Sequence, residues 1–277
     1  MLTDTTDSAR LSQLPLADFI FGSTSGMHEV RKTLESALED DLPVLIEGES
    51  GTGKEVVARY LHVRSERAGG PFVRVNCGAI PARLLEGEMF GQSKTAGGSV
   101  VLAANGTLFL DEIAEMDLAL QQKVANALKA SRRGRTGDPL NARIVCSSSG
   151  NLKGAILEGG AGLSSHFGHR VRLLPLRERK QDIPQLCEYL VDKFARNFGR
   201  TAPRLKPEVL EAFQLWNWPG NIRELENWIA RIVIFGTEEA MGHEFRRQTA
   251  EREGSAFTRH HALRANVARV RRARRHV

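Results

Sequence analysis

The sequence has few cysteines, no long apolar run and no internal repeat, and each absence excludes a class of protein. Its three cysteines are scattered and form no CxxC pair, which excludes a zinc knuckle or a disulfide framework and favours a reducing compartment. No stretch approaches the roughly 18 uncharged residues of a membrane span, and the N-terminus lacks the basic and apolar regions of a secretory signal. We therefore expect a cytoplasmic protein with no part in the membrane.

The charge of the chain is concentrated at one end. The 277 residues are 41% hydrophobic and 26% charged, a composition typical of one large or two ordinary globular domains. Residues 241–277 hold ten Arg, no Lys and three Glu, whereas the first 240 residues hold 29 basic and 30 acidic side chains. Binding to a polyanion would therefore depend on the tail and not on the main body.

Short apolar runs alternate with helical periodicity over about the first 175 residues. The runs with strand character are 43–48, 72–77, 107–110, 143–146 and 170–174, and the helical stretches between them include 27–38, 54–67 and 118–130. Most runs are too apolar to have one face in water, so they predict a parallel sheet covered by helices on both faces. The later segments 182–198, 206–215 and 221–235 are helical only and predict a small helical domain.

A glycine-rich segment, GESGTGK at 48–54, follows the first apolar run and precedes a helix. This GxxxxGK spacing, in this context, predicts a phosphate-binding loop. Glycines let backbone N–H groups surround phosphates, and Lys54 and the start of its helix supply positive charge. We assign nucleotide binding to Gly48, Glu49, Ser50, Gly51, Thr52, Gly53, Lys54 and Glu55. Glu55 stands where the general pattern has a Ser or Thr ligand of Mg²⁺, so the metal has to depend on other groups.

A second segment, TLFLDE at 107–112, is an apolar strand that ends in two acids. On its own such an end is as consistent with a solvated strand terminus as with a site. Together with the phosphate loop it predicts that Asp111 holds Mg²⁺, and that Glu112 orients and polarises the attacking water.

Six motifs together resemble the AAA+ domain of sigma-54-dependent transcriptional activators, the bacterial enhancer-binding proteins. They are GESGTGKE (48–55), VNCGAIP (75–81), EMFG (88–91), GTLFLDEI (106–113), LPLRER (174–179) with DIP (182–184), and WPGNIRELEN (218–227). The resemblance covers about residues 18–240. It implies a P-loop AAA+ parallel sheet with flanking helices, an all-helical lid, ATP and Mg²⁺ as cofactors, and self-association into a hexameric ring.

The resemblance also implies roles for residues that spacing alone does not single out. Phe21 and Gly22 match the segment beside the adenine, and Arg223 matches the sensor arginine that reaches from the lid to the nucleotide. Asn76 matches an asparagine that restrains the catalytic glutamate until the target is engaged, and Arg170 matches an arginine finger presented to the neighbouring subunit. Without the motifs, Arg223 would be read as a solvated charge and Asn76 as a polar strand end.

The sequence departs from the family at three places that bear on activity. Residues 92–105 (QSKTAGGSVVLAAN) lack the GAFTGA loop that grips sigma-54, so we expect no remodelling of that holoenzyme. Ser164 replaces one arginine finger, and the loss of such an arginine costs about 10³ to 10⁵ in rate. The sensor strand ends in Ser148 and Ser149 where the family has a Thr-Asn pair. We therefore expect ATP binding with weakened hydrolysis.

We predict four parts along the chain. They are an N-terminal extension (1–17), the AAA+ nucleotide-binding subdomain (18–178), the helical lid (179–240) and a basic tail (241–277). The extension is too short for a receiver domain, and the tail has no evident helix-turn-helix. The tail could bind DNA phosphates without reading sequence, be a disordered solvated segment, or be an out-of-frame remnant of a DNA-binding domain.

Three functions stay open at this stage. The chain is a weakened Mg-dependent ATPase that regulates transcription, a nucleotide-responsive regulator that hydrolyses little and binds DNA, or a degenerate subunit that modulates a full-length homologue. RNA polymerase or a sigma factor is a possible partner of each.

Overall fold

The computed structural model describes residues 4–5, 14–91, 97–131, 141–150, 152 and 163–236. Its described residues divide into two compact units. The α/β unit holds the residues up to 185 together with 218–225, and the helical unit holds 186–217 and 226–236. The segment 218–225 thus groups with the α/β unit by its contacts, and the predicted bounds of the lid, 179–240, stay a prediction.

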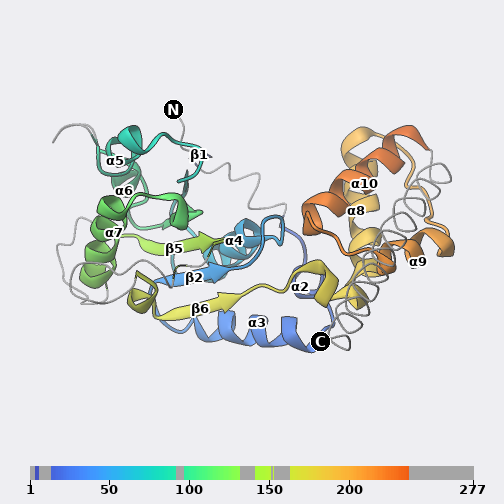
Figure 1. Ribbon diagram of the computed structural model, residues 1–277, viewed down its shortest axis with the longest axis horizontal. Coiled ribbons are helices and arrows are strands. Elements are labelled where there is room, and N and C mark those ends of the chain that lie inside the picture. Colours follow the sequence, from blue (N-terminus) through green and yellow to red (C-terminus); the bar gives the residue numbers. More distant parts are fainter. Residues whose placement is uncertain are drawn as a thin grey trace, which may run out of the picture. The chain divides into compact units, whose positions relative to one another are not determined.

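The α/β unit is built on a six-stranded sheet in the order β1-β3-β4-β5-β2-β6. The neighbouring strands β5, β2 and β6 are labelled in Figure 1. The strands are β1 (Asp4–Thr5), β2 (Val44–Glu47), β3 (Phe72–Asn76), β4 (Thr107–Asp111), β5 (Arg143–Ser148) and β6 (His169–Arg172). β2 to β6 pair in parallel, and only the short β1 at the edge is antiparallel. The predicted α/β architecture with a parallel sheet is confirmed, and the carboxyl ends of five strands meet at one edge.

Both faces of the sheet are buried under helices, which explains why the strand sequences are apolar at successive positions. On one face Val44 and Ile46 pack with α3 (Ser25–Ser36) and α4 (Lys54–Arg64). On the other face Leu45 belongs to a core with α5 (Ala82–Phe90), α6 (Ser99–Leu102) and α7 (Leu118–Ser131). Since side chains alternate along a strand, neighbouring residues enter opposite cores.

Most predicted helices are present, with ends shifted by a few residues, but four elements were missed. These are β1, α2 (Ala17–Phe21), α5 and α6. Each is short, so it offers few periods of apolar spacing to recognise. Single-turn 3-10 helices at Ile113–Glu115, Leu163–His166, Leu176–Glu178 and Lys180–Asp182 complete the unit.

The helical unit contains most of α8 (Ile183–Phe198), all of α9 (Pro207–Leu215) and most of α10 (Asn221–Phe235). Pro207 begins α9 at the position where a missing N–H costs nothing. Leu190, Phe213 and Ile229, one from each helix, are buried. Across the part of the chain that the structure describes, no helix is both long and apolar enough to cross a membrane.

Candidate functional site

The loop 48–53 joins the buried strand β2 to helix α4. Gly51 and Gly53 have φ of +79° and +98°, the left-handed region that favours glycine. A Cβ on Gly51 would lie 2.3 Å from the carbonyl oxygen of Gly220, so no other residue fits there without a shift. α4 then begins at Lys54. A tight loop before a helix start favours an anion, because backbone N–H groups and the helix dipole face it.

The Lys54 side chain folds back over this loop and is buried, with 6% of its surface exposed. Its Nζ donates to the carbonyl oxygens of Gly48 at 3.0 Å and Glu49 at 3.3 Å, and to Ser149 Oγ at 2.5 Å. It also forms an ion pair with Glu112 Oε1 at 3.0 Å. The ammonium group therefore lies at the centre of the loop, where a phosphate would compete with the carboxylate for it.

Glu112 follows the end of β4 in the left-handed conformation, with φ +59°. Its carboxylate accepts hydrogen bonds from the backbone N–H of Ser149 at 2.7 Å and from Ser149 Oγ at 2.6 Å. Burial alone would raise the pKa of Glu112, but the hydrogen bonds from Ser149 and Lys54 outweigh it and hold the pKa below its ordinary value. Glu112 is therefore an ionised group fixed by two neighbours.

Asn76, for which the resemblance implies the role of restraining Glu112, has a different contact here. Its Oδ1 accepts a hydrogen bond from the backbone N–H of Gly78 at 3.2 Å. The groups that hold the Glu112 carboxylate are Ser149 and Lys54. In this conformation the side chains that contact the Glu112 carboxylate are therefore Ser149 and Lys54, and the role of Asn76 stays a prediction.

Asp111, the predicted metal ligand, is the last residue of β4 and is 9% exposed. Its Oδ1 accepts a hydrogen bond from Ser147 Oγ, and its Oδ2 is 2.6 Å from Arg74 Nη2. Glu55, at the first turn of α4, forms ion pairs with Arg59 and Arg74. Both acids are therefore neutralised by arginines.

The predicted adenine-flanking residues lie at the end of α2. The Phe21 ring is buried and meets Tyr60 of α4 edge-on, with 5.1 Å between ring centroids. Gly22 has φ +64°, and a Cβ there would overlap the carboxylate of Asp182. Phe21 thus belongs to the core beneath this segment, and Gly22 is required by the close approach of Asp182.

Arg179 connects the α2 segment to the phosphate loop. It is 1% exposed, and its guanidinium donates to the carbonyl oxygens of Ile20 and Thr52, each at 3.3 Å. Burial lowers the pKa of Arg179 to about 10, which leaves it charged at neutral pH. The residue fixes two parts of the site with respect to each other.

The segment 218–225 brings two further side chains to the phosphate loop. Arg223 Nη1 donates to Ser50 Oγ at 3.3 Å. Asn221 is fully buried, and its Nδ2 donates to Ser50 O at 3.0 Å and Glu49 Oε2 at 3.2 Å. The predicted sensor arginine is therefore beside the loop, and Asn221 joins the loop to its segment.

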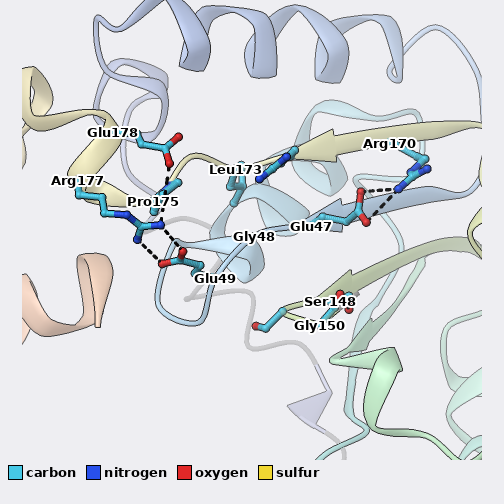
Figure 2. Close-up of a pocket in the computed structure, with 12 residues that line it drawn as sticks. Glu47, Gly48, Glu49, Ser148, Gly150, Arg170, Leu173, Pro175, Arg177 and Glu178 are labelled. Carbon is cyan, nitrogen blue, oxygen red and sulfur yellow. Dashed lines mark hydrogen bonds and ion pairs between the residues drawn. The ribbon is translucent and has the colours of Figure 1, made fainter. Parts of the chain in front are cut away.

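A cavity of about 500 Å³ opens between the loop and the ends of β2, β5 and β6 (Figure 2). Within it Arg170 pairs with Glu47 at 2.9 Å, and Arg177 pairs with Glu49 at 2.6 Å. Hydrogen bonds from Arg177 and then from Asn221 lower the pKa of Glu49 to about 2. Arg170, the predicted finger, is thus engaged by an acid of its own chain.

Among the residues that contact the predicted site residues, several were not assigned from the sequence, including Arg74, Ser149, Arg179 and Asn221. Arg179 and Asn221 lie inside the LPLRER and WPGNIREL motifs, so the motifs themselves carried a signal for them. Ser149 was noted as lacking an amide, and its hydroxyl contact was not foreseen. Arg74 carried no signal, because one arginine in a strand has no pattern around it.

Two family models match the chain. Residues 20–175 match the sigma-54 interaction domain, and residues 177–261 match an AAA+ ATPase lid domain. Among curated relatives, the DNA-binding transcriptional activator HyfR of Escherichia coli K12 is 37% identical over 81% of this chain and 36% of its own length. The transcriptional regulatory protein FlbD of Caulobacter vibrioides is 40% identical over 75% of this chain and 49% of its own. The chain thus spans between a third and half of these relatives.

The chain is also similar to solved structures of related proteins. NtrX from Brucella abortus in complex with ADP is 33% identical, with a TM-score of 0.69 over 80% of this chain and 52% of its own. NtrX in complex with ATP is 34% identical, with a TM-score of 0.67 over 77% of this chain and 52% of its own. AMPPCP-bound DnaA from Aquifex aeolicus, at 18% identity and a TM-score of 0.51, shares the fold.

Proposed function

The chain belongs to the family of the sigma-54 interaction (AAA+) domain, and from this we propose that it is an ATP-binding transcription regulator with weak ATPase activity. One observation carries the proposal. The buried Lys54 ammonium lies over the glycine loop, bonded to Gly48 O and Glu49 O and paired with Glu112. A triphosphate would exchange these acceptors for its own oxygens, which form stronger charge-assisted bonds.

The proposed reaction is in-line attack of water on the terminal phosphate. Glu112, held ionised by its neighbours, would take up the role of orienting and polarising the water once Lys54 turns to the phosphate. Asp111 offers oxygen ligands at the end of β4, which fits Mg²⁺, a cation usually bound by one or two carboxylates and by substrate phosphates. When bound, the metal would neutralise charge on the phosphate oxygens.

Weak turnover is supported by three features of this chain. The finger position 164 is Ser, within the 3-10 helix Leu163–His166. The remaining finger, Arg170, pairs with Glu47 of the same chain. Glu112 is fixed by Ser149. The last two contacts have to be released before hydrolysis, whereas the arginine missing at position 164 cannot be supplied by this chain.

The same contacts favour a second candidate, a nucleotide-responsive regulator that binds ATP without turning it over. Phosphate release in one turnover, measured at protein concentrations where rings form, separates the two candidates. A burst of phosphate supports the ATPase, and tight binding without release supports the second candidate.

The relatives of the chain also suggest the partners on which it acts. We propose that the chain acts on the transcription machinery, as the names of its relatives indicate for those proteins. We also propose that it forms a ring, which the resemblance in its motifs implies. Sigma-54 remodelling is not part of the proposal, because the sequence 92–105 has no GAFTGA motif. DNA binding through residues 241–277 lies outside the described residues and stays a prediction.

The direct test of nucleotide binding is calorimetry with ATP on the whole chain and on Lys54→Ala. We expect the substitution to weaken binding by about 10- to 100-fold, the value of one to two charge-assisted hydrogen bonds. Lys123→Ala is the matched control, since Lys123 pairs with Glu86 on the surface. Equal affinity of the wild type and Lys54→Ala would reject the assignment of the site.

A further inference from the structure

Four charged side chains from three elements, Asp111, Arg74, Glu55 and Arg59, form a network of three successive ion pairs. Arg74 of β3 reaches Asp111 Oδ2 at 2.6 Å through Nη2, and Glu55 Oε2 at 3.1 Å through Nη1. Glu55 Oε1 in turn accepts from Arg59 at 2.9 Å. Two arginines face two carboxylates, so the network is neutral as it stands.

The strand register and helix α4 place these four side chains next to one another. In the parallel pairing of β3 with β4, Arg74 lies opposite Phe109, and the residue two further along lies opposite Asp111. Side chains two apart share a face, so Arg74 and Asp111 both project toward α4. Glu55 and Arg59 are one helical turn apart on α4, and the Arg59 guanidinium is anchored 4.7 Å from the centroid of the Phe72 ring.

The network bears directly on the metal assigned to Asp111. The oxygen that would ligate Mg²⁺, Oδ2, is the one that Arg74 holds, since Oδ1 accepts the Ser147 hydroxyl. A divalent cation and a guanidinium at one carboxylate oxygen repel each other. Glu55, which stands where other phosphate loops have a metal-binding hydroxyl, already holds the second nitrogen of Arg74.

We propose that Arg74 is a positioning residue that sets how strongly the nucleotide site holds Mg²⁺. Arg74 competes with the metal for Asp111 Oδ2, and Glu55 is the acceptor onto which the guanidinium withdraws when metal and nucleotide enter together. Glu55 thus acts through Arg74 and not as a metal ligand. This inference rests on the proposed nucleotide binding.

The test measures the affinity of a fluorescent ADP analogue for the whole chain, first in EDTA and then across a Mg²⁺ titration. In Arg74→Met the Mg²⁺ concentration for half-maximal tightening falls, on the order of tenfold, because the competitor is gone. In Glu55→Gln the Mg²⁺ concentration for half-maximal tightening rises, because the neutral amide attracts the Arg74 guanidinium less strongly than the Glu55 carboxylate does and leaves more of its charge to Asp111. Arg74→Lys keeps the charge and lies between the wild type and Arg74→Met.

Arg67→Met is the matched control. The Arg67 side chain is 23% exposed and pairs with Asp41 at 2.6 Å, whereas Arg74 is 26% exposed and pairs with Asp111 at the same distance. The control leaves the Mg²⁺ midpoint unchanged. General damage to the fold would not move the midpoint in opposite directions in Arg74→Met and Glu55→Gln.

The outcomes separate this inference from the proposed function. If the wild type binds no analogue with or without Mg²⁺, the proposed function fails, and this inference fails with it. If the analogue binds but folded Arg74→Met keeps the wild-type midpoint, only the role of Arg74 is overturned. If Arg74→Met does not fold, the other two variants decide. The role of Arg74 is then overturned if Arg74→Lys and Glu55→Gln both have the Mg²⁺ midpoint of the wild type.

Discussion

Asp111 and Glu112 are adjacent acids at the end of one strand, yet their surroundings hold them in different ways. The Asp111 side chain is 12% exposed and faces Arg74 and the α4 network. The Glu112 side chain is 25% exposed and is held by Ser149 and by Lys54, a group that a phosphate would also bind. Asp111 is thus paired with an arginine of the protein, whereas Glu112 is paired with a lysine that a bound phosphate would also contact.

The comparison predicts that the two acids differ most in their effect on folding. In Asp111→Asn, Arg74 loses the charge of its closer partner in a largely buried place, and we expect a cost of about 1–3 kcal/mol in the free energy of unfolding. Glu112→Gln is expected to cost about 1 kcal/mol or less, since this carboxylate is more exposed. Urea unfolding of both variants at pH 7 measures the difference. Equal urea midpoints of the two variants would show that Asp111 and Glu112 contribute alike to stability, and would contradict the comparison.

A smaller effect is expected from the group that restrains Glu112. Ser149→Ala removes one donor to Glu112 and one acceptor of Lys54 while keeping the backbone N–H. We expect severalfold tighter ATP binding and faster phosphate release, because a neutral hydrogen bond is worth about 1 kcal/mol.

Ser65→Ala is the control for this variant. The hydroxyl of Ser65 donates to His62 O at the end of α4 opposite to the loop, so its removal leaves both measurements near the wild-type values. Slower phosphate release in Ser149→Ala would show that Ser149 supports the reaction and does not restrain it.

The smallest effect concerns a third acid, Glu49, which extends the comparison to the loop itself. Its pKa in the fold, about 2, lies below the ordinary 4.5, chiefly because Arg177 donates to it. Its contribution to stability is therefore complete above about pH 4.5 and is lost as the pH falls toward 2. In Glu49→Gln we expect the free energy of unfolding to fall less steeply as the pH is lowered from 4.5 to 2. The side chain is 43% exposed, so the change is a fraction of 1 kcal/mol.

Acid titration of the unfolding free energy, in the wild type and in Glu49→Gln, checks this prediction. Glu178→Gln is the control, because its carboxylate is 4.0 Å from Arg177 and makes the weaker contact. If the two variants have identical acid limbs, the Glu49–Arg177 pair does not contribute to stability.

The sheet and the phosphate loop were predictable because their signals are local. The run 72–77 predicted β3 at Phe72–Asn76, and 107–110 predicted β4 at Thr107–Asp111. The helix expected from residue 54 begins at Lys54. In each case a few neighbouring residues carry the pattern. Because the sheet is buried on both faces, its strands are apolar at successive positions and can be recognised from the sequence.

The grouping of segment 218–225 was not predictable in this way. Helical periodicity predicted a helix over 221–235, but it did not predict that Asn221 binds Ser50 and Glu49 of the loop, more than 170 positions earlier in the sequence. Periodicity describes a helix, and it does not say which unit the first turn of that helix packs against.

The sequence alone determined where the phosphate loop, its lysine and the two acids lie, since each belongs to a short strand-to-loop junction whose residue types are fixed by backbone geometry and charge. Only the tertiary structure decided what neutralises each acid. Asp111 meets Arg74, 37 positions earlier, and Glu112 meets Ser149, 37 positions later. The strand order, with β3 and β5 on either side of β4, brings these partners together. Contacts between neighbouring strands depend on that order, which the spacing of residues along the chain does not encode.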